Sequence, residues 1–409
     1  MCPTAAEKGV ENITESAEVT LESALAETAL TEASKAAETA GTGAPVLEGV
    51  GSELIILCSF VLIGKNTVCF IDFFKLFFRF FRVIPVFIRM IFYNIKRIGK
   101  FLIEAGFMEQ LVVAGGTSFI ARHLLRRIDK TKYRVTALVR HLPPEKIDGV
   151  TYVRLALAEY DKLPEYVPQC DIYLPFVWDG TRKAAREAEE VNEASYRAVF
   201  QSIQAMIRQC GCKKIILPGT CHEYKNNGCP LDEEAPCQPQ SYYGVYKHRL
   251  YEEAAALCRQ TGTALVALRM FSVYGADDRR EKMVNTWMWK LLCHEPLRMT
   301  EGLQIWSFLH VEDVARAFSL AVEGKIAGGC YHLAALEHRR LRDFVEEMKA
   351  IAESRSEIQY GAVPYSAGEI PHVIFVSRRG QQEFPWSPMI SFSDGMREMA
   401  AHYRSLAGV

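Results

Sequence analysis

The sequence lacks the cysteine spacing of a zinc site and the cysteine density of a mini-protein held by disulfides. Its 12 cysteines are scattered through 409 residues, and no CxxC motif is accompanied by a second one. A net charge is nearly absent as well, because 48 Lys and Arg balance 49 Asp and Glu. No global field therefore favours a nucleic-acid partner. We expect a cytoplasmic protein with reduced thiols, no metal site and no bound nucleic acid.

Aromatic residues are missing from residues 1–50, which are rich in Ala, Thr and Glu and contain nine Glu against only Lys8 and Lys35. Such a segment cannot bury enough apolar surface to offset the entropy lost on ordering. A secretory signal is not expected, because a cationic start followed by an apolar run is missing. We predict a disordered acidic tail.

Residues 51–107 have the opposite composition, with 12 of the 22 Phe in the chain. The apolar run Leu54–Gly64 has only about half of the ~20 residues that a membrane-spanning helix needs. On a helical wheel, the charged side chains from Asp72 to Glu104 fall into one arc, and aromatic and aliphatic residues fill the rest. This pattern predicts an amphipathic helical segment that anchors the protein peripherally on the inner face of a membrane. The alternatives are packing within the protein or an oligomer, and a misassigned upstream start.

Apolar runs and helical patterns alternate in the remaining three hundred residues. Strands separated by helices of this length predict an α/β fold with a Rossmann-like doubly wound parallel sheet. We assign residues 108–275 to an NAD(P)-binding domain and residues 276–409 to a smaller substrate lobe that is partly interleaved with it. The predicted strands include Gln110–Ala114, Tyr133–Val139, Asp171–Val177, Lys213–Leu217 and Ala264–Arg269, and the predicted helices include Thr181–Gln209 and Tyr243–Arg259.

Residues 110–128 follow the order strand, tight turn, helix. The apolar run Gln110–Ala114 ends at Gly115, and a helical pattern covers Arg122–Ile128. Free N–H groups at such a helix start can receive a pyrophosphate where small residues let the backbone approach, although a glycine pair after a strand is often just a turn. We predict a dinucleotide site formed by Gly115, Gly116, Thr117, Ser118, Phe119 and Ile120.

The next apolar run, Tyr133–Val139, ends at Arg140. In this architecture, the residue at that strand end contacts the ribose of the adenosine. An acidic residue favours a free 2′-hydroxyl, whereas an arginine can pair with a 2′-phosphate. We therefore predict NADP as the cofactor. NAD is the alternative if Arg140 is merely a solvated surface residue.

A threonine and a Tyr-x-x-x-Lys motif follow the later strands. Thr220 comes shortly after the run Lys213–Leu217, and Tyr243 stands four residues before Lys247, which places both on one helical face. We expect the ammonium to lower the pKa of the phenol, which would then exchange a proton with a sugar hydroxyl while hydride moves at the same carbon. Thr220 would hydrogen-bond the reacting oxygen. The alternative is a half-buried helix face with an extended lysine.

From about Gln110 onward, the sequence resembles the extended short-chain dehydrogenase/reductase family, in particular the NAD-dependent epimerase/dehydratase group that acts on nucleotide sugars. The resemblance implies that Tyr243 is the base, that Lys247 also holds the nicotinamide ribose, and that Thr220 is the third catalytic residue. It also implies a homodimer. Five landmarks in order carry it: Gly115–Ala121, Gly219–Tyr224, Tyr243–Lys247, Leu268–Gly275 and Phe308–Ala315.

Several positions depart from the pattern of that family. Its second and third turn glycines are Ser118 and Ala121 here, and an aspartate near the adenine is Ala156. The Asp-Glu pair of the dehydratases is replaced by Cys221 and His222, which disfavours 4,6-dehydration. His222 is either a substitute acid or a solvated loop residue.

Trp306 stands where the epimerases of the family place an arginine on the nucleotide diphosphate. His310 and Asp313 are either structural or in contact with the substrate. The arginines that would supply the missing charge are Arg279, Arg280, Arg378 and Arg379.

Two functions remain open. The first is an NAD(P)-dependent epimerase or ketoreductase that acts at C4 of a nucleotide-linked sugar. The second is a Rossmann scaffold that binds a dinucleotide or a sugar nucleotide with weak or no catalysis. Ser118, Ala156 and Trp306 favour the second, whereas the intact tyrosine and lysine pair favours the first.

Overall fold

The computed structural model describes residues 108–407, apart from 180, 182, 226–229 and 366–373. The predicted acidic tail and the predicted membrane anchor at residues 51–107 lie outside the described residues. The cysteines in the described part of the chain are all free thiols.

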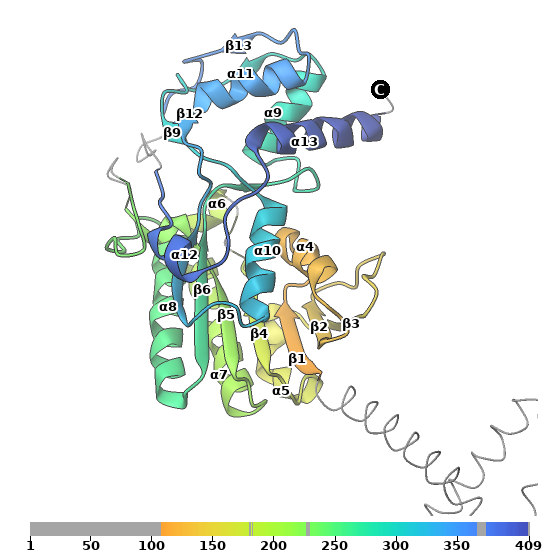
Figure 1. Cartoon of the computed structure of the whole chain (residues 1–409), viewed down its shortest axis with the longest axis vertical. Coiled ribbons are helices and arrows are strands. Elements are labelled where there is room, and N and C mark those ends of the chain that lie inside the picture. The colour runs from red at the N-terminus through yellow and green to blue at the C-terminus, as the bar shows by residue number, and fades with distance from the viewer. Residues whose placement is uncertain (1–107, 180, 182, 226–229, 366–373, 408–409) are drawn as a thin grey trace, which may run out of the picture. The chain divides into compact units, whose positions relative to one another are not determined.

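Seven parallel strands form the central sheet (Figure 1), in the order β11-β6-β5-β4-β1-β2-β3. Their connections reverse direction between β1 and β4, and ligands bind at the carboxyl ends of the strands beside such a switch point. The strands are β1 (Glu109–Ala114), β2 (Tyr133–Val139), β3 (Val150–Arg154), β4 (Ile172–Pro175), β5 (Lys214–Thr220), β6 (Ala264–Met270) and β11 (Gly329–Leu333).

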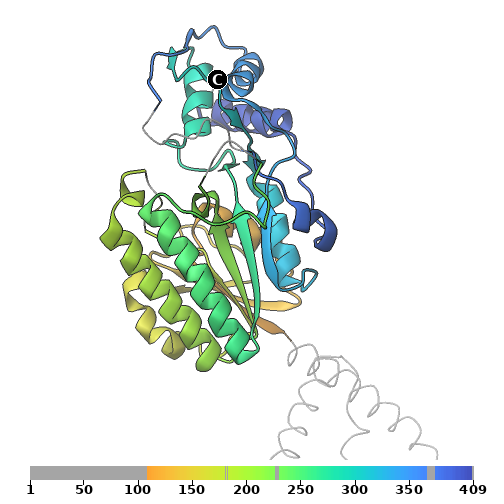
Figure 2. The same cartoon turned by 90° about the vertical axis from the view of Figure 1, so that its left-hand side faces the viewer.

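Helices cover both faces of the sheet, because alternate residues of each strand point to opposite sides. Leu111 and Val113 of β1 pack with α4 (Phe119–Arg127) and α10 (Val311–Val322). Val112 and Ala114 pack with η1 (Leu157–Lys162), α5 (Leu163–Tyr166), α7 (Glu189–Arg208) and α8 (Tyr242–Thr261). Figure 2 shows α7 and α8 side by side on this second face. The predicted doubly wound fold is confirmed.

A smaller lobe lies at one end of the sheet (Figure 1) and has a core of its own, in which Phe308, Phe344 and Phe392 stack together. The chain enters and leaves the lobe several times, and β7 (Val273–Tyr274) pairs with β10 (Leu309–His310) on the way. The lobe contains α9 (Met283–Leu292), β8 (Leu297–Arg298), β9 (Ile305–Trp306), β12 (Arg339–Arg340), α11 (Leu341–Ile351), β13 (Ile358–Gln359) and α13 (Phe392–Ala407).

The long helix predicted from Thr181 to Gln209 is wrong in one respect, because it is divided into α6 (Lys183–Arg186) and α7. The side-chain amide of Asn192 donates to the carbonyl oxygens of Ala185 (2.8 Å) and Ala188 (2.9 Å). In a continuous helix, these carbonyl oxygens would accept from backbone N–H groups instead. The break therefore depends on one buried side chain.

Helices α7 and α8 are each 20 residues long. In the described ranges, no helix combines the length and the apolar character needed to cross a membrane.

Candidate active site

The turn after β1 requires glycine at two positions. Gly115 has a φ of +75°, and a Cβ there would lie 2.9 Å from the backbone of Phe176 in the segment after β4. A Cβ on Gly116 would lie 2.6 Å from the Cβ of Ala137 in β2. The backbone of the turn therefore packs closely between both neighbouring strands, as the glycine pattern predicts.

Helix α4 begins directly after this turn with unused hydrogen-bonding capacity. Ser118 is its N-cap, but the side chain of Ser118 makes no capping bond and its buried Oγ has no partner. The first turn of α4 contains no acidic residue. A hydroxyl and free N–H groups at this helix start fit a pyrophosphate. The predicted residues Thr117, Phe119 and Ile120 lie in the same turn and at the helix start.

Arg140 is the residue directly after β2, and it is exposed. Because β1 and β2 are parallel and Ala114 pairs with Leu138, Arg140 and the glycine turn lie at the same edge of the sheet. The structure thus places Arg140 beside the predicted dinucleotide turn, on the strand where the ribose contact is expected.

Thr220 is the last residue of β5. The predicted strand ended at Leu217, but the observed strand continues through Pro218 and Gly219, in register with β6. Beyond it, the chain turns back sharply: the hydroxyl of Thr220 accepts from the N–H of His222 (3.4 Å), and Glu223 accepts from the N–H of Thr220 (2.8 Å). The side chain of Thr220 is therefore fixed at the carboxyl end of the sheet.

Helix α8 brings Tyr243 to Thr220. Ser241 caps the helix by accepting from the N–H of Gly244 (3.2 Å). A Cβ on Gly244 would collide with the carbonyl oxygen of His222, so only glycine lets the first turn of α8 pack against the residues after β5. The Thr220 side chain lies near the phenol of Tyr243 and acts to lower its pKa.

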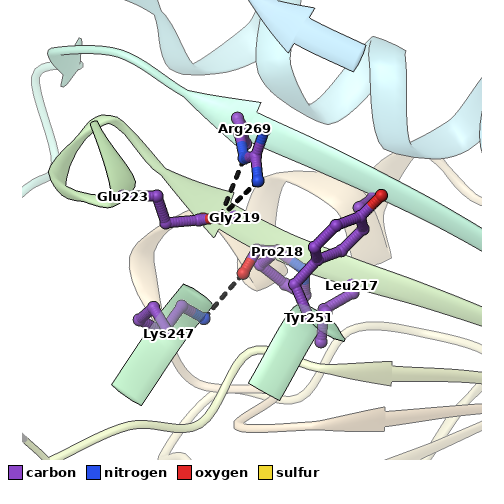
Figure 3. A pocket seen from close by; sticks show the side chains of 8 residues that line it. Leu217, Pro218, Gly219, Glu223, Lys247, Tyr251 and Arg269 are labelled. Carbon is purple, nitrogen blue, oxygen red and sulfur yellow. Dashed lines mark hydrogen bonds and ion pairs between the residues drawn. The ribbon is translucent and has the colours of Figure 1, made fainter. Parts of the chain in front are cut away.

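Lys247 lies one helical turn after Tyr243 and is buried. Its Nζ donates to the carbonyl oxygen of Pro218 (2.6 Å; Figure 3). The same atom lies 4.8 Å from the ring centre of Trp178. The structure therefore brings Thr220, Tyr243 and Lys247 together from β5 and α8.

The expected lowering of the Tyr243 pKa is wrong for this state of the protein. Burial raises the pKa of Tyr243 to about 12, and the nearby Thr220 side chain only partly opposes that rise. The ammonium of Lys247 is directed to Pro218, so it does not offset the burial of the phenol. Burial also lowers the pKa of Lys247 to about 8, against the attraction of Glu223.

Sequence reasoning missed two residues that surround Tyr243. The ring of Trp178 lies edge-on to that of Tyr243, with 6.1 Å between the ring centres. The ring of His222 is also edge-on, at 5.5 Å, and Arg186 contacts its Nε2 (3.1 Å). No motif marks Trp178 or Arg186, because they come from the segments after β4 and reach Tyr243 only in the folded chain.

A buried ion pair supports the turn that carries Thr220. The Nε and Nη2 of Arg269 both donate to Glu223 at 2.8 Å, and the two side chains are almost fully buried (Figure 3). They line a small pocket between β5, β6 and α8 with Leu217, Pro218, Gly219, Lys247, Tyr251 and Ala267. A buried and fully paired ion pair of this kind holds the turn in a single conformation.

The same network continues away from the site. Arg269 donates to the hydroxyl of Tyr224 (2.5 Å), which lies 2.8 Å from Nε2 of His332. Nδ1 of His332 lies 3.1 Å from the carbonyl oxygen of Val376, so the proton is on Nδ1 and Tyr224 donates to Nε2. The chain of bonds thus links the end of β5 to the segment before α12 (Arg378–Glu383).

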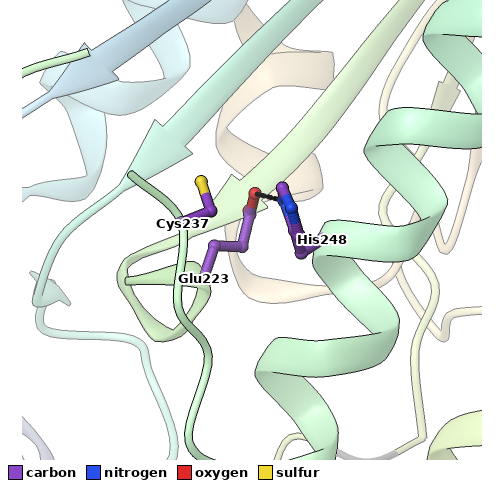
Figure 4. Close-up of side chains that lie close together, drawn as sticks. All are labelled: Glu223, Cys237 and His248. Carbon is purple, nitrogen blue, oxygen red and sulfur yellow. Dashed lines mark ion pairs between the residues drawn. The ribbon is translucent and has the colours of Figure 1, made fainter. Parts of the chain in front are cut away.

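Glu223 also lies near Cys237 and His248 (Figure 4), with one ligand atom from each within 4.8 Å of the others. Both oxygens of Glu223 are already engaged, one by the Thr220 N–H and the other by Arg269. A cation at this place would also face the guanidinium of Arg269. We therefore assign no metal to these residues.

A model of the NAD-dependent epimerase/dehydratase family matches residues 111–334, which is more than half of the chain. The chain belongs to this family. The family prediction is confirmed, and with it the expectation of an enzyme of this kind.

Two curated relatives match over nearly their full length. The dTDP-6-deoxy-L-talose 4-dehydrogenase (NAD(+)) of Aggregatibacter actinomycetemcomitans is 21% identical over 62% of this chain and 94% of that enzyme. The CDP-abequose synthase of Salmonella muenchen is 22% identical over 71% of this chain and 97% of that enzyme. Among solved structures, the UDP-glucuronic acid 4-epimerase of Bacillus cereus in complex with NAD superposes with a TM-score of 0.64 at 18% identity, over 73% of this chain and 98% of that one. A likeness at this identity shows the shared fold.

Within this epimerase/dehydratase fold, the arginines considered for the diphosphate differ in their surroundings. Arg280 stacks on Trp289, with its guanidinium 3.2 Å from the ring centre. Arg378 pairs with Asp232 and Arg379 with Glu383. Arg279 is exposed and, among the described residues, forms no ion pair.

His310 and Asp313 of the epimerase/dehydratase signature have structural roles. His310 is buried and caps α10, and its Nε2 lies 3.6 Å from Glu398 of α13. Asp313 is also buried and accepts from the N–H groups of Met389 (3.0 Å) and Ile390 (2.9 Å). Asp313 therefore holds the C-terminal segment onto α10, and His310 caps this helix.

Proposed function

We propose that the protein transfers hydride at C4 of a nucleotide-linked sugar, with Tyr243 as the acid/base. The convergence of Thr220, Tyr243 and Lys247 at the carboxyl end of β5 carries this proposal. The curated relatives support it, because one of them, matched over 94% of its length, is named as a 4-dehydrogenase of a nucleotide-linked deoxysugar.

The residues divide the reaction among them. In the reductive direction, the Tyr243 hydroxyl donates a proton to the carbonyl oxygen at C4, and the hydroxyl of Thr220 hydrogen-bonds that same oxygen. The ammonium of Lys247, one turn away, is directed to Pro218 here. It would stabilise the phenolate that remains by turning toward it during the reaction. A nicotinamide dinucleotide bound at the turn after β1 would supply the hydride. Trp178 packs against Tyr243 and limits access of water to the phenol.

The protonation state of Tyr243 suits the proton-donating step, which a ketoreductase and an epimerase share. With a pKa of about 12, the side chain is a phenol at neutral pH, which is the form that donates a proton to a carbonyl. The stoichiometry separates the two reactions. A ketoreductase consumes one reduced dinucleotide for each product formed, whereas an epimerase restores the dinucleotide in every cycle.

The Tyr243→Phe variant tests the acid/base role. We expect kcat to fall by roughly 10²- to 10⁴-fold, the usual contribution of a general acid or base. Tyr242→Phe is the matched control, because Tyr242 is exposed on the same turn of α8 and should keep its activity within about twofold. A Tyr243→Phe enzyme as fast as the parent would rule out this residue as the base.

The cofactor proposal assigns the dinucleotide to the turn from Gly115 to Ile120 and to Lys247. The unpartnered Ser118 hydroxyl and the start of α4 support a pyrophosphate there. Arg140 favours NADP, while the name of one relative includes NAD(+). Dissociation constants of NADPH and NADH decide between them. If the 2′-phosphate binds Arg140, Arg140→Ala weakens NADPH roughly 10- to 100-fold and leaves NADH unchanged.

A second candidate is a Rossmann scaffold that binds its ligands without turnover. Ser118, Ala156 and Trp306 favour it, because they replace residues that the family uses to hold the dinucleotide and the substrate. A sensitive assay of hydride exchange with nucleotide sugars distinguishes the two candidates. Exchange that depends on Tyr243 eliminates the scaffold.

A further inference from the structure

Arg186 lies at the edge of the site with most of its donors unused. Its Nε donates to the carbonyl oxygen of Thr181 (3.2 Å), and its Nη1 contacts Nε2 of His222 (3.1 Å). These contacts use two of the five N–H donors of a guanidinium. Across the part of the chain that the structure describes, Arg186 pairs with no carboxylate. Toward the described residues, Nη2 and the second hydrogen of Nη1 thus have no partner, and both lie on one edge of the guanidinium.

His222 fixes the guanidinium without neutralising it. Because Nη1 of Arg186 is always a donor, Nε2 of His222 accepts and the ring is neutral. Burial, followed by the positive charge of Arg186, lowers the pKa of His222 to about 4, so the ring stays uncharged near neutral pH. His222 is in this respect a positioning residue for Arg186.

The charge of Arg186 is close to the proposed acid/base. The ring of His222 is packed edge-on against the ring of Tyr243 at 5.5 Å. Burial raises the pKa of Tyr243, and the charge of Arg186 is among the influences that oppose the rise. On the side of the lobe, burial lowers the pKa of Lys282, and the charges of Arg279 and Arg186 lower it further. The charge of Arg186 therefore acts on both Tyr243 and Lys282.

We propose that Arg186 binds a carboxylate at C6 of the sugar, so that the preferred substrate is a nucleotide-linked uronic acid. The inference rests on the proposed function and specifies its substrate class. In a hexopyranose, C5 is bonded to C4 and carries C6, so a C6 carboxylate lies two bonds from the carbon that reacts at Tyr243. The free edge of a guanidinium matches the two oxygens of a carboxylate.

The diphosphate is the other source of anionic oxygens in such a substrate. It is attached at C1, which lies across the pyranose ring from C4. Arg186 contacts His222, and His222 packs against Tyr243, which acts at C4. We therefore expect Arg186 to be closer to the C6 group than to the diphosphate. Lys282 and Arg279, on the side of the lobe, are better placed for the diphosphate.

The test compares UDP-glucuronic acid with UDP-glucose, which differ only at C6, and uses UDP alone to report the diphosphate. Dissociation constants from titration calorimetry and kcat/KM are measured with the full-length protein and with Arg186→Gln. We expect the parent to prefer the acid at least roughly tenfold, and Arg186→Gln to lose roughly 10- to 100-fold for the acid only. Arg197→Gln is the control, because Arg197 pairs with Glu193 on the exposed face of α7.

The alternative outcomes overturn the inference in distinguishable ways. Equal losses with both sugars and with UDP mean that Arg186 serves the diphosphate. Equal losses with both sugars but not with UDP mean that it acts on Tyr243 alone. A parent that binds and turns over UDP-glucose without any preference refutes the uronic acid but keeps the proposed function. A parent that neither binds nor turns over the two sugar nucleotides, nor their dTDP- and CDP-linked counterparts, contradicts both.

The role of His222 is tested separately with two variants. His222→Gln keeps an acceptor for Arg186, and we expect it to retain the preference for the acid. His222→Leu removes the acceptor, and we expect the preference to fall at least roughly threefold, a small part of the contribution of Arg186. If His222 only packs against its neighbours, His222→Leu would keep the preference for the acid as well as His222→Gln does, or better. Either result excludes the positioning role.

Discussion

At Tyr243 and Lys247, burial acts on two groups of opposite charge type, so their pKa values move apart. Burial raises the pKa of Tyr243 to about 12 and lowers that of Lys247 to about 8. We therefore predict that the rate of ketone reduction falls as pH rises through about 8, because Lys247 loses its proton while Tyr243 is still a phenol. The profile of kcat/KM against pH measures this, and Lys247→Arg should move the inflection upward, since arginine stays protonated.

If the first alkaline inflection stays near pH 8 in Lys247→Arg, the titrating group is a different one. Cys221 is one such group near Tyr243, but burial raises the pKa of its thiol, so it does not supply an inflection at neutral pH.

His123 links three elements through a charged imidazole. It contacts Glu312 of α10 (2.5 Å) and Asp277 after β7 (2.8 Å). Burial alone would lower its pKa, but the hydrogen bonds and charges of the two carboxylates raise it to about 9, above the unfolded value of 6.5. Its stabilisation is therefore complete below about pH 6.5 and is lost as pH rises through about 9.

The predicted loss of stability from His123 is about 1–2 kcal/mol, because solvent and the nearby Arg122, Arg126 and Arg127 screen the carboxylates. Urea unfolding at pH 6.5 and pH 9.5 measures it. His123→Gln should flatten this pH dependence, and an unchanged slope in that variant would assign the effect to other groups.

At the scale of elements, the contact between α8 and the turn after β5 depends on Gly244. Gly244→Ala places a methyl group against the carbonyl oxygen of His222 and should push the first turn of α8 away from Thr220. We predict that kcat falls by at least roughly 100-fold while stability falls by about 1–3 kcal/mol, the usual cost of overpacking.

Gly262 at the other end of α8 offers the matched control. It has a φ of +71° and nothing within 4 Å of an added Cβ, so Gly262→Ala should destabilise through backbone strain alone and keep kcat. Equal effects of the two variants on kcat would show that helix stability, not the position of Tyr243, limits the rate.

The strands and the common location of Thr220, Tyr243 and Lys247 could be predicted from sequence because their signals are local. The runs that became β1, β2 and β6 are continuous and apolar, and Tyr243 and Lys247 are one helical turn apart. The break between α6 and α7 could not be predicted, because it depends on how the amide of Asn192 meets carbonyls of the preceding turn. The end of β5 was also missed, because Pro218 and Gly219 are usually strand breakers.

The buried network around Glu223 was hidden from sequence analysis for a different reason. Arg269 lies 46 residues after Glu223, and His332 lies 108 residues after Tyr224. Each pairing depends on the register of β5 against β6 and β11, which periodicity does not report. The pKa of Tyr243 was missed likewise, since the direction of the Lys247 ammonium toward Pro218 is a tertiary feature.

At the scale of the whole molecule, residues 51–107 set the location that we propose. Their aromatic and basic composition predicts attachment to the surface of an anionic membrane. In liposome flotation, the full-length protein should float with vesicles that contain phosphatidylglycerol and be released by high salt. A chain that lacks residues 52–107 should stay at the bottom. Equal partitioning of the two chains would contradict membrane attachment.

The account as a whole depends on hydride transfer at C4 by the site at the carboxyl end of β5. The most direct measurement uses a nucleotide sugar deuterated at C4, incubated with the oxidised dinucleotide, and follows the label by mass spectrometry. We predict that deuterium appears on the dinucleotide with the parent protein and that the transfer is slowed by roughly 10²-fold or more in Tyr243→Phe. Label that remains on C4, or leaves it equally fast without the Tyr243 hydroxyl, would contradict the account.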